Sequence, residues 1–282
     1  TADNTVTWTS LGAVGNFTGN QAPHARLGNA LTTNWAQAGN TIFTKSSHAE
    51  IQAVGSLGLT GASTLASPQK ILCHNGGAYP PAAGNLTIGA TVTMSSAGGI
   101  FTINALHVYY EGIEFVAAGT GNTIIVGGNF GFLRFENCKL TLSANNVSCI
   151  ITLGSGGTAT SKICMKNTSL SFANVSQIIT LFGEVKWQDT LNAIQGTVPT
   201  TMFKALLAAS FLNFIVDGVD LSAAGSGKTL MGASIAYNGR VKFQNCKLGA
   251  SVSIASTPTF LGLVDLIDCD SGDTNYRNER YA

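Results

Sequence analysis

Carboxylate side chains are the residues of this sequence best suited to chemistry. Glu111 and Glu136 each end a similar short run, "VYYE" and "LRFE". Two carboxyl groups about 5 to 9.5 Å apart in a groove can cleave a glycosidic bond. Such a groove also needs exposed aromatic side chains, and Tyr109 and Trp187 are available, although they do not align on one face. The further carboxylate candidates are Glu114, Asp217, Asp220, Asp265 and Asp268.

The histidines do not form a ligand set, because they are scattered along the chain at His24, His48, His74 and His107. The run "SHAE" (47–50) brings Ser, His and Glu together in sequence, but a catalytic triad is defined by geometry rather than by adjacency. We expect these residues to shape the start of the first repeat. The sequence therefore predicts no catalytic, cofactor-binding or metal-binding residues and no cofactor.

A glycine-rich segment, "SAAGSGKTL" (222–230), resembles a nucleotide-binding P-loop. The motif requires glycine where Ser222 stands, and Asp217 and Asp220 do not fit the buried strand that should precede it. We interpret the segment as a loop between repeats.

The six cysteines contain no CxxC pair, which argues against a zinc or redox motif. A site of stacked cysteines around a metal is a less favoured alternative. We predict free, buried thiols, because a free cysteine packs like a small apolar residue. The cysteines are Cys73, Cys138, Cys149, Cys164, Cys246 and Cys269.

A short phrase that contains Glu111 and Glu136 recurs along the chain. Its copies begin 22 to 30 residues apart, a period that is typical of solenoids. The copies are "VYYEGIEF" (108–115), "LRFENCKL" (133–140), "ICMKNTSL" (163–170), "VKWQDTLN" (185–192), "FIVDGVDL" (214–221), "VKFQNCKL" (241–248) and "VDLIDCDS" (264–271).

Each position of the phrase has a physical meaning. Positions one and three are apolar and position two is mostly polar, as in a half-buried strand. Position five is always Gly, Asn or Asp, the residues that tolerate a left-handed backbone. Position six is compact and includes Cys138, Cys246 and Cys269. The phrase thus predicts a strand, a sharp bend and a second strand, with position six facing inwards.

Stacked copies of this unit predict an all-β chain, a right-handed parallel β-helix with an irregular N-terminal cap. Successive coils would lie about 4.8 Å apart, which would bring Glu111 and Glu136 together. A leucine-rich repeat lacks support because its LxxLxLxxN phrase is absent, and a propeller blade needs about 40 residues.

The composition agrees with a turn-rich β protein. Of 282 residues, 33 are glycine and only 10% are charged, against a usual share of about 25%. The net charge of +1 gives no support to nucleic-acid or membrane partners. No apolar run reaches the ~20 residues of a membrane-spanning helix.

We divide the chain into an N-terminal arm or cap (1–44), the β-helix (45–272) and a C-terminal tail (273–282). The arm is expected to hold a short helix around 30–37 and a strand at 41–44. Within the β-helix, "TTMFKALLAAS" (200–210) has apolar residues at helical spacing and is interpreted as an inserted helical turn.

The stretch "PPAAGNLTIGATVTMSSAGGIFTINALHVYYEGIEFVAAGTG" (80–121) resembles β-helical, tailspike-like virion proteins of tailed bacteriophages. "TIFTKSSHAEIQA" (41–53) and "DSGDTNYRNERYA" (270–282) share this resemblance. Some members of this group decorate the capsid as trimers, and their shared motifs are structural. The resemblance implies a location on the virion capsid surface, after assembly in the host cytoplasm.

The function expected from this resemblance is that of a non-enzymatic capsid decoration, or cement, protein. Its partners would be two further copies of the chain, joined through lateral faces, and the major capsid protein. We expect one of the two chain ends to contact the capsid protein: the N-terminal arm is favoured, and the charged C-terminal segment (272–282) is the alternative. The alternative is a receptor-binding tailspike that cleaves glycans as a hydrolase or lyase. A bacterial surface adhesin is a third class, less favoured because "TADNTVTWTS" (1–10) shows no signal-peptide pattern.

Overall fold

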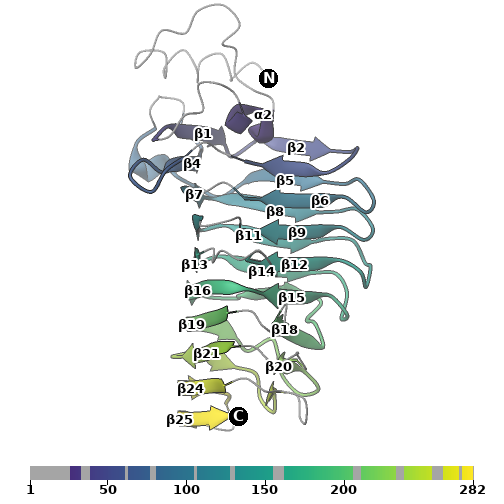
Figure 1. The fold of residues 1–282 in the computed structure, drawn as a ribbon, viewed down its shortest axis with the longest axis vertical. Helices are drawn as coiled ribbons and strands as arrows, with labels where there is room; N and C mark the ends of the chain where they lie inside the picture. Colours follow the sequence, from purple (N-terminus) through teal and green to yellow (C-terminus); the bar gives the residue numbers. More distant parts are fainter. Residues whose placement is uncertain are drawn as a thin grey trace, which may run out of the picture.

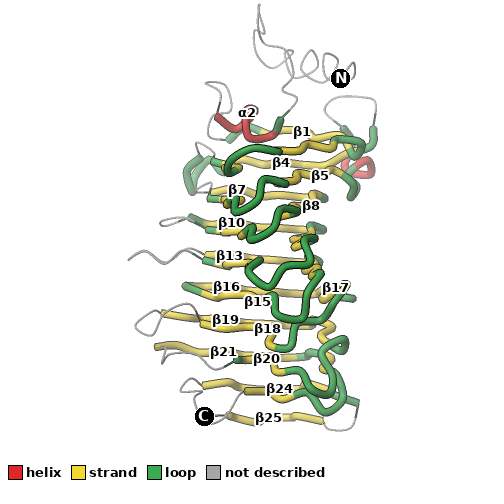
Figure 2. Tube along the Cα trace, turned by 90° about the vertical axis from the view of Figure 1, so that its right-hand side faces the viewer, coloured by secondary structure: helices red, strands yellow, loops and turns green. Residues whose placement is uncertain are grey.

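The computed structural model describes residues 26–32, 39–60, 63–76, 81–104, 107–127, 131–154, 162–205, 211–232, 238–255, 263–272 and 275–281. Their strands wind through a column of stacked coils (Figure 1). Figure 2 shows the same stack from the side, with successive strands lying as parallel rungs. The predicted parallel β-helix is confirmed, whereas its right-handed winding and its N-terminal cap stay predictions.

Three parallel sheets, here called A, B and C, form the walls of the column. Sheet A contains β1 (Thr41–Lys45), β4 (Gln69–His74), β7 (His107–Glu111), β10 (Phe132–Glu136), β13 (Lys162–Lys166), β16 (Gly183–Thr190), β19 (Phe211–Leu221), β21 (Asn238–Gln244), β24 (Leu263–Asp270) and β22 (Lys247–Leu248). Sheet B contains β2 (Ala49–Gln52), β5 (Ala90–Met94), β8 (Ile113–Ala117), β11 (Lys139–Leu142), β14 (Ser169–Phe172) and β17 (Ile194–Gly196). Sheet C contains β3 (Leu57–Leu59), β6 (Ile100–Ile103), β9 (Thr123–Val126), β12 (Ile150–Leu153), β15 (Ile178–Leu181), β18 (Thr201–Ala205), β20 (Thr229–Met231) and β23 (Ser253–Ala255).

The bend at position five of the phrase is confirmed in every copy. Each residue there has a positive φ, between 44° and 75°, which carries the chain from sheet A into the next strand. Side chains other than Gly, Asn and Asp adopt this conformation at a cost of about 1–2 kcal/mol. The seven residues are Gly112, Asn137, Asn167, Asp189, Gly218, Asn245 and Asp268.

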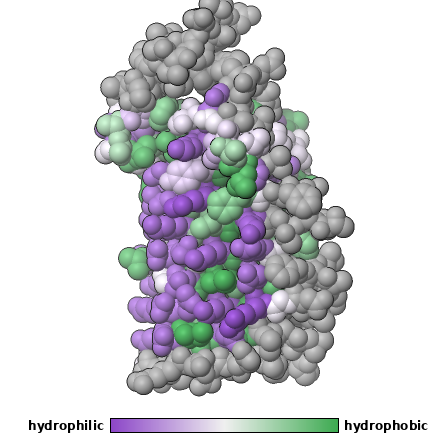
Figure 3. Space-filling model, turned by 60° about the vertical axis from the view of Figure 1, so that its left-hand side comes forward, coloured by the Kyte–Doolittle hydropathy of each residue, from purple (hydrophilic) through white to green (hydrophobic). Residues whose placement is uncertain are grey.

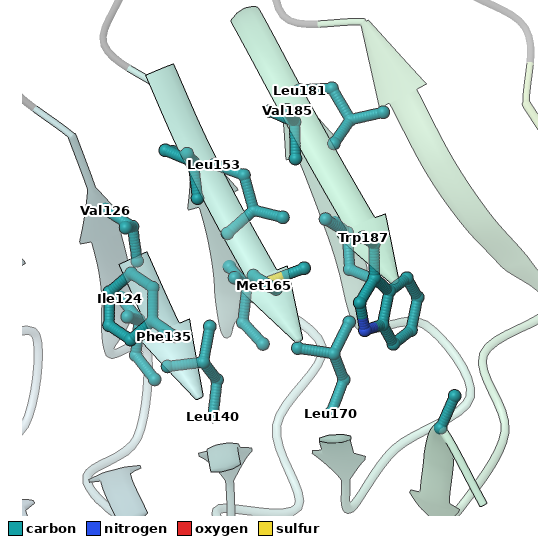
Figure 4. Close-up of a cluster of buried hydrophobic side chains, with 14 of the residues drawn as sticks. Ile124, Val126, Phe135, Leu140, Leu153, Met165, Leu170, Leu181, Val185 and Trp187 are labelled. Atoms are coloured by element: carbon teal, nitrogen blue, oxygen red, sulfur yellow. The ribbon is translucent and has the colours of Figure 1, made fainter. Parts of the chain in front are cut away.

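Positions one and three of the phrase fill the interior. Their side chains are buried in all seven copies, and side chains from sheets B and C meet them (Figure 4). In the middle coils, the rings of Tyr110 and Phe135 stack with their centroids 5.3 Å apart, and Phe115 meets both edge to face. This stacking follows from the strand register of sheet A, in which Phe135 is the partner of Tyr110 on one side and of Met165 on the other.

The cysteines of position six face the interior, as predicted. Cys138, Cys246 and Cys269 are buried, and each thiol donates a hydrogen bond to a backbone carbonyl. All six cysteines are free, and only Cys164 is partly exposed. Position six therefore forms an inward row of stacked side chains. The other members of this row, Ile113, Thr168, Thr190 and Val219, are also buried.

Further elements lie at the two ends of the column. Helix α2 (Leu27–Thr32) buries Leu27 and Leu31 in the core, and the Leu27 amide donates to Glu50 at 2.6 Å. This helix begins earlier than the expected 30–37, and residues 33–38 lie outside the described part. Strand β1 confirms the expected strand at 41–44. At the other end, β25 (Asn275–Tyr281) pairs antiparallel with β24. A 3-10 turn, η1 (Ala83–Asn85), precedes β5.

The helical turn predicted within 200–210 is wrong for the residues that the structure describes. Thr201–Ala205 is strand β18, and residues 206–210 lie outside the described part. Phe203 pairs with Ile179 of the preceding coil and with Met231 of the following one. The two neighbouring strands satisfy the backbone and bury Phe203, so tertiary pairing overrides the local helical spacing.

Candidate functional site

The outer face of sheet A carries much of the charge of the chain. The phrase places positions two and four, and the residue before position one, on this face, because side chains alternate along a strand. Figure 3 shows the face as a mainly hydrophilic column. In the seven copies of the phrase its charged residues are Glu111, Arg134, Glu136, Lys162, Lys166, Glu184, Lys186, Asp217, Arg240, Lys242 and Asp265. Lys45 of β1 and Lys70 of β4 lie on the same face.

The structure confirms that Glu111 and Glu136 stack on successive coils. They are register partners in β7 and β10. The Tyr109 hydroxyl bridges them, 2.7 Å from Oε2 of Glu111 and 3.2 Å from Oε2 of Glu136. The two carboxylate oxygens are therefore no more than about 6 Å apart. This upper bound is compatible with the spacing of about 5–5.5 Å in a retaining glycosidase and is shorter than that of an inverting one.

Two cationic side chains, Arg134 and Lys166, lie close to Glu136. The sequence analysis did not identify either of them as part of the site. Arg134 Nη2 lies 2.9 Å from Glu136 Oε2, and Lys166 Nζ lies 3.6 Å from Oε1. Arg134 also lies over the Tyr109 ring, 5.6 Å from its centroid. The repeat contained the signal for these contacts, because Arg134 precedes Glu136 by two positions and Lys166 is its counterpart in the next copy.

These neighbours hold Glu136 in its ionised form. Partial burial alone would raise the pKa of Glu136, but the hydrogen bond and charge of Arg134, with help from Tyr109 and Lys166, outweigh it and lower the pKa. Burial and the hydrogen bond to Glu111 raise the pKa of Tyr109, so its hydroxyl stays a donor. Glycoside cleavage needs one carboxylic acid with a raised pKa to protonate the leaving group and one ionised carboxylate. The lowered pKa of Glu136 does not suit the acid role, and it is compatible with the role of the ionised carboxylate.

Trp187 does not contribute to a surface groove. Its side chain is buried, and its indole Nε1 donates to the Thr168 carbonyl at 2.8 Å. The expectation that it is an available exposed aromatic residue is wrong, because it occupies position three, where the phrase directs side chains inwards. Tyr109 is partly exposed, at position two of its copy.

The other candidate carboxylates do not join Glu111 and Glu136. Glu114 lies on sheet B, 3.4 Å from Lys139, and Asp220 accepts two bonds from Ser222 in a turn. Asp217 and Asp265 share the face of sheet A but belong to coils further along the column. Asp268 occupies a bend.

The remaining sequence motifs have structural explanations. The glycine-rich segment 222–228 connects β19 to β20, and Lys228 Nζ donates to the Val198 carbonyl at 2.8 Å. A strand rather than a helix follows the segment, so it does not have the P-loop architecture. His48 Nε2 lies 3.4 Å from Oε2 of the buried Glu50, at the first coil. Within the described ranges, no three His, Cys, Asp or Glu side chains are grouped to hold a metal ion.

A pocket opens beside Glu111, at the bend between sheets A and B. Its volume is about 320 Å³, and it is lined by Leu86, Thr87, Ile88, Glu111 and Asn137. Asn137 Nδ2 lies 3.5 Å from Glu111 Oε1, and the Asn167 amide donates to Asn137 at 2.6 Å. The sequence did not predict this pocket, because Leu86–Ile88 belongs to a connection outside the repeated phrase.

Fold and site together define a parallel β-helix with a polar, ion-paired lateral face. No protein-family model matches the chain, and neither a curated protein nor a solved structure is significantly similar to it. The described part contains no helix of the length and apolar character needed to cross a membrane.

Proposed function

We propose that this chain is a non-enzymatic virion structural protein, a trimeric β-helical decoration protein of a bacteriophage capsid. The sequence resemblance to tailspike-like virion proteins supplies the context. The observation that supports the non-enzymatic part is that the Glu136 carboxylate is ion-paired with Arg134 in its own strand and with Lys166 in the next coil. A carboxylate held in this way stabilises the stack of coils rather than serving as a proton donor.

The fold suits a protein that strengthens a particle surface. Each inner coil pairs with the coils on both sides through sheets A, B and C, so few backbone groups are open to attack along the column. The buried apolar side chains form one core cluster that runs along the column and includes Ile42 near one end and Cys269 near the other. A capsid surface exposed outside the host benefits from such resistance to proteolysis and unfolding.

The proposal is tested by adding the purified protein to capsids that lack a decoration protein. Trimers should form in sedimentation analysis, and cryo-EM of the particles should show the column bound at regular capsid positions. A protein that stays monomeric and leaves the capsids bare would refute the assignment.

A glycan-cleaving tailspike is the second candidate, and the approach of Glu111 and Glu136 to within about 6 Å favours it. Incubation with host capsular or lipopolysaccharide glycans distinguishes the two functions. The decoration protein should leave the glycans intact. Release of oligosaccharides by the wild type that is lost in Glu111→Gln or Glu136→Gln would establish the tailspike instead.

A further inference from the structure

The pocket beside Glu111 is held open by the backbone around it. The Thr87 amide donates to the Cys73 carbonyl at 3.1 Å, and the Gly89 amide donates to the Gly112 carbonyl at 3.2 Å. These bonds fix both ends of the 87–89 segment against the coils below and above. The wall formed by Leu86, Thr87 and Ile88 is therefore tied by backbone hydrogen bonds to the coils on both sides.

Among the residues that the structure describes, Glu111 differs from the other carboxylates of its neighbourhood in having no ion-paired cation. Glu136, Glu114 and Asp265 each form an ion pair. No ion pair among the described residues includes Glu111. Its Oε2 accepts the Tyr109 hydroxyl at 2.7 Å, while its Oε1 has only the long contact with Asn137. One carboxylate oxygen thus remains available at the pocket.

The pocket also has an apolar wall. Leu86 and Ile88 line it together with Glu111, and 62% of the Ile88 surface is exposed. An exposed isoleucine beside a carboxylate without a cation suits a ligand that has an aliphatic stem and a positively charged end. A lysine side chain has this chemistry, because it buries its methylene groups and keeps its charged group at a polar partner.

We propose that this pocket binds the side chain of a lysine presented by a partner protein, with the ammonium group at Glu111 Oε1 and the stem against Ile88. Lysine fits better than arginine. A guanidinium group binds a carboxylate through both oxygens, whereas an ammonium group acts as a point charge. Oε2 of Glu111 is already occupied by Tyr109, which leaves a single acceptor. This inference does not depend on the virion assignment.

The test compares a lysine probe with a norleucine probe, which lacks the ε-ammonium group, and with Nα-acetyl-arginine methylamide. Nα-acetyl-lysine methylamide and Nα-acetyl-norleucine methylamide are titrated into the isotope-labelled full chain, and amide shifts of Thr87, Ile88 and Gly112 are followed by NMR. The lysine probe should shift these amides in a saturable way at millimolar concentration. The Glu111→Gln variant should bind it about tenfold more weakly, because a charge-assisted hydrogen bond is lost.

Asp217→Asn is the matched control. Asp217 occupies the same phrase position and accepts a bond from Asn245, as Glu111 does from Asn137. The Asp217→Asn substitution removes one negative charge from the same face. It should leave the amide shifts of Thr87, Ile88 and Gly112 that the lysine probe causes unchanged. Equal shifts with the norleucine probe, stronger binding of an arginine probe, or no shift with the lysine probe would each overturn the proposal.

Discussion

At position five of the phrase, two glycines occupy the same kind of bend in different surroundings. Gly112 and Gly218 have φ values of 75° and 66°. A β-carbon added to Gly112 would lie 1.9 Å from the Thr87 carbonyl oxygen. One added to Gly218 would lie 3.3 Å from a side-chain oxygen of Asp189. Both sites require the left-handed conformation, but only Gly112 also requires the absence of a side chain.

We therefore expect Gly112→Ala to lower the melting temperature far more than Gly218→Ala. Alanine at either site adds the backbone strain of about 1 kcal/mol. At Gly112 it also pushes the Thr87 backbone out of the ladder, as any substitution there would. Thermal unfolding followed by circular dichroism measures both variants. Equal losses would contradict the close approach of Thr87 to the bend.

The ion pairs of Glu136 predict a stability that falls in acid. Because the pKa of Glu136 is lowered in the folded state, its contribution is complete above its unfolded value, about 4.3. That contribution is lost as the pH falls through the lower folded value. At pH 7 the Glu136→Gln variant should melt below the wild type. As the pH falls below about 4.3, the difference between the two melting temperatures should shrink progressively. A difference that stays the same throughout acid titration, until the protein unfolds, would argue against a contribution from ionised Glu136.

At the scale of the elements, the position-six ladder makes the cysteines unequal in reactivity. Burial raises the pKa of Cys138 to about 12, and its side chain is buried. Cys164, at position two of its strand, is partly exposed. Iodoacetamide reacts with thiolates that it can reach. Mass spectrometry should therefore show Cys164 alkylated before Cys138 in the folded protein. Labelling of Cys138 at the same rate would mean that the ladder does not face inwards. Denaturant should remove the difference.

The repeated phrase predicted much of the fold because its rules are local. The alternation of apolar and polar residues along the first strand placed Phe135 in the core. The restriction of position five to Gly, Asn or Asp located the bend at Asn137. The stacking of Glu111 on Glu136 followed from a fixed register. What lies between phrases was less predictable. Strand β18 was missed because its pairing partners are supplied by other coils.

The pocket beside Glu111 could not be predicted for a similar reason. Its wall, Leu86 to Ile88, is an irregular connection that carries no period. Its position depends on contacts of Thr87 with Cys73 and of Gly89 with Gly112, in coils that precede and follow it. Only the folded chain brings these segments together.

Across the whole molecule, the lateral faces differ in charge. Sheet A bears ion pairs, whereas the outward positions of β9, β12 and β15 in sheet C are uncharged and mainly β-branched. Thr152 and Thr180 share a hydrogen bond of 2.8 Å along this row. Interface cores are depleted of charged residues, so sheet C is the face best suited to the proposed trimer. The row consists of Thr123, Ile125, Ile150, Thr152, Ile178 and Thr180.

A lysine introduced into this row should break the trimer. We expect Ile150→Lys to sediment as a monomer while keeping the circular dichroism of the wild type, because a buried unpaired charge opposes association. Gln188→Lys on sheet A, which adds the same charge to an already charged face, should remain trimeric. A trimeric Ile150→Lys together with a monomeric Gln188→Lys would move the interface to sheet A.

The last prediction concerns attachment to the capsid, for which the N-terminal arm is the favoured contact in the sequence analysis. Removal of residues 1–40 would also remove α2, whose Leu27 and Leu31 lie in the core and whose first amide is bonded to Glu50. Loss of binding in that variant would therefore be ambiguous between a lost contact and a damaged first coil.

Removal of residues 1–25 alone keeps α2 in place and makes the experiment decisive. This variant should keep the trimer and the melting temperature of the full chain, because the contacts of Leu27 with the core remain. It should fail to bind undecorated capsids, since the segment proposed to contact the capsid is gone. Cosedimentation with capsids measures the occupancy. Full occupancy by the shortened chain would place the capsid contact elsewhere, and Gly272 to Tyr281, which includes β25, would then be the segment to substitute next.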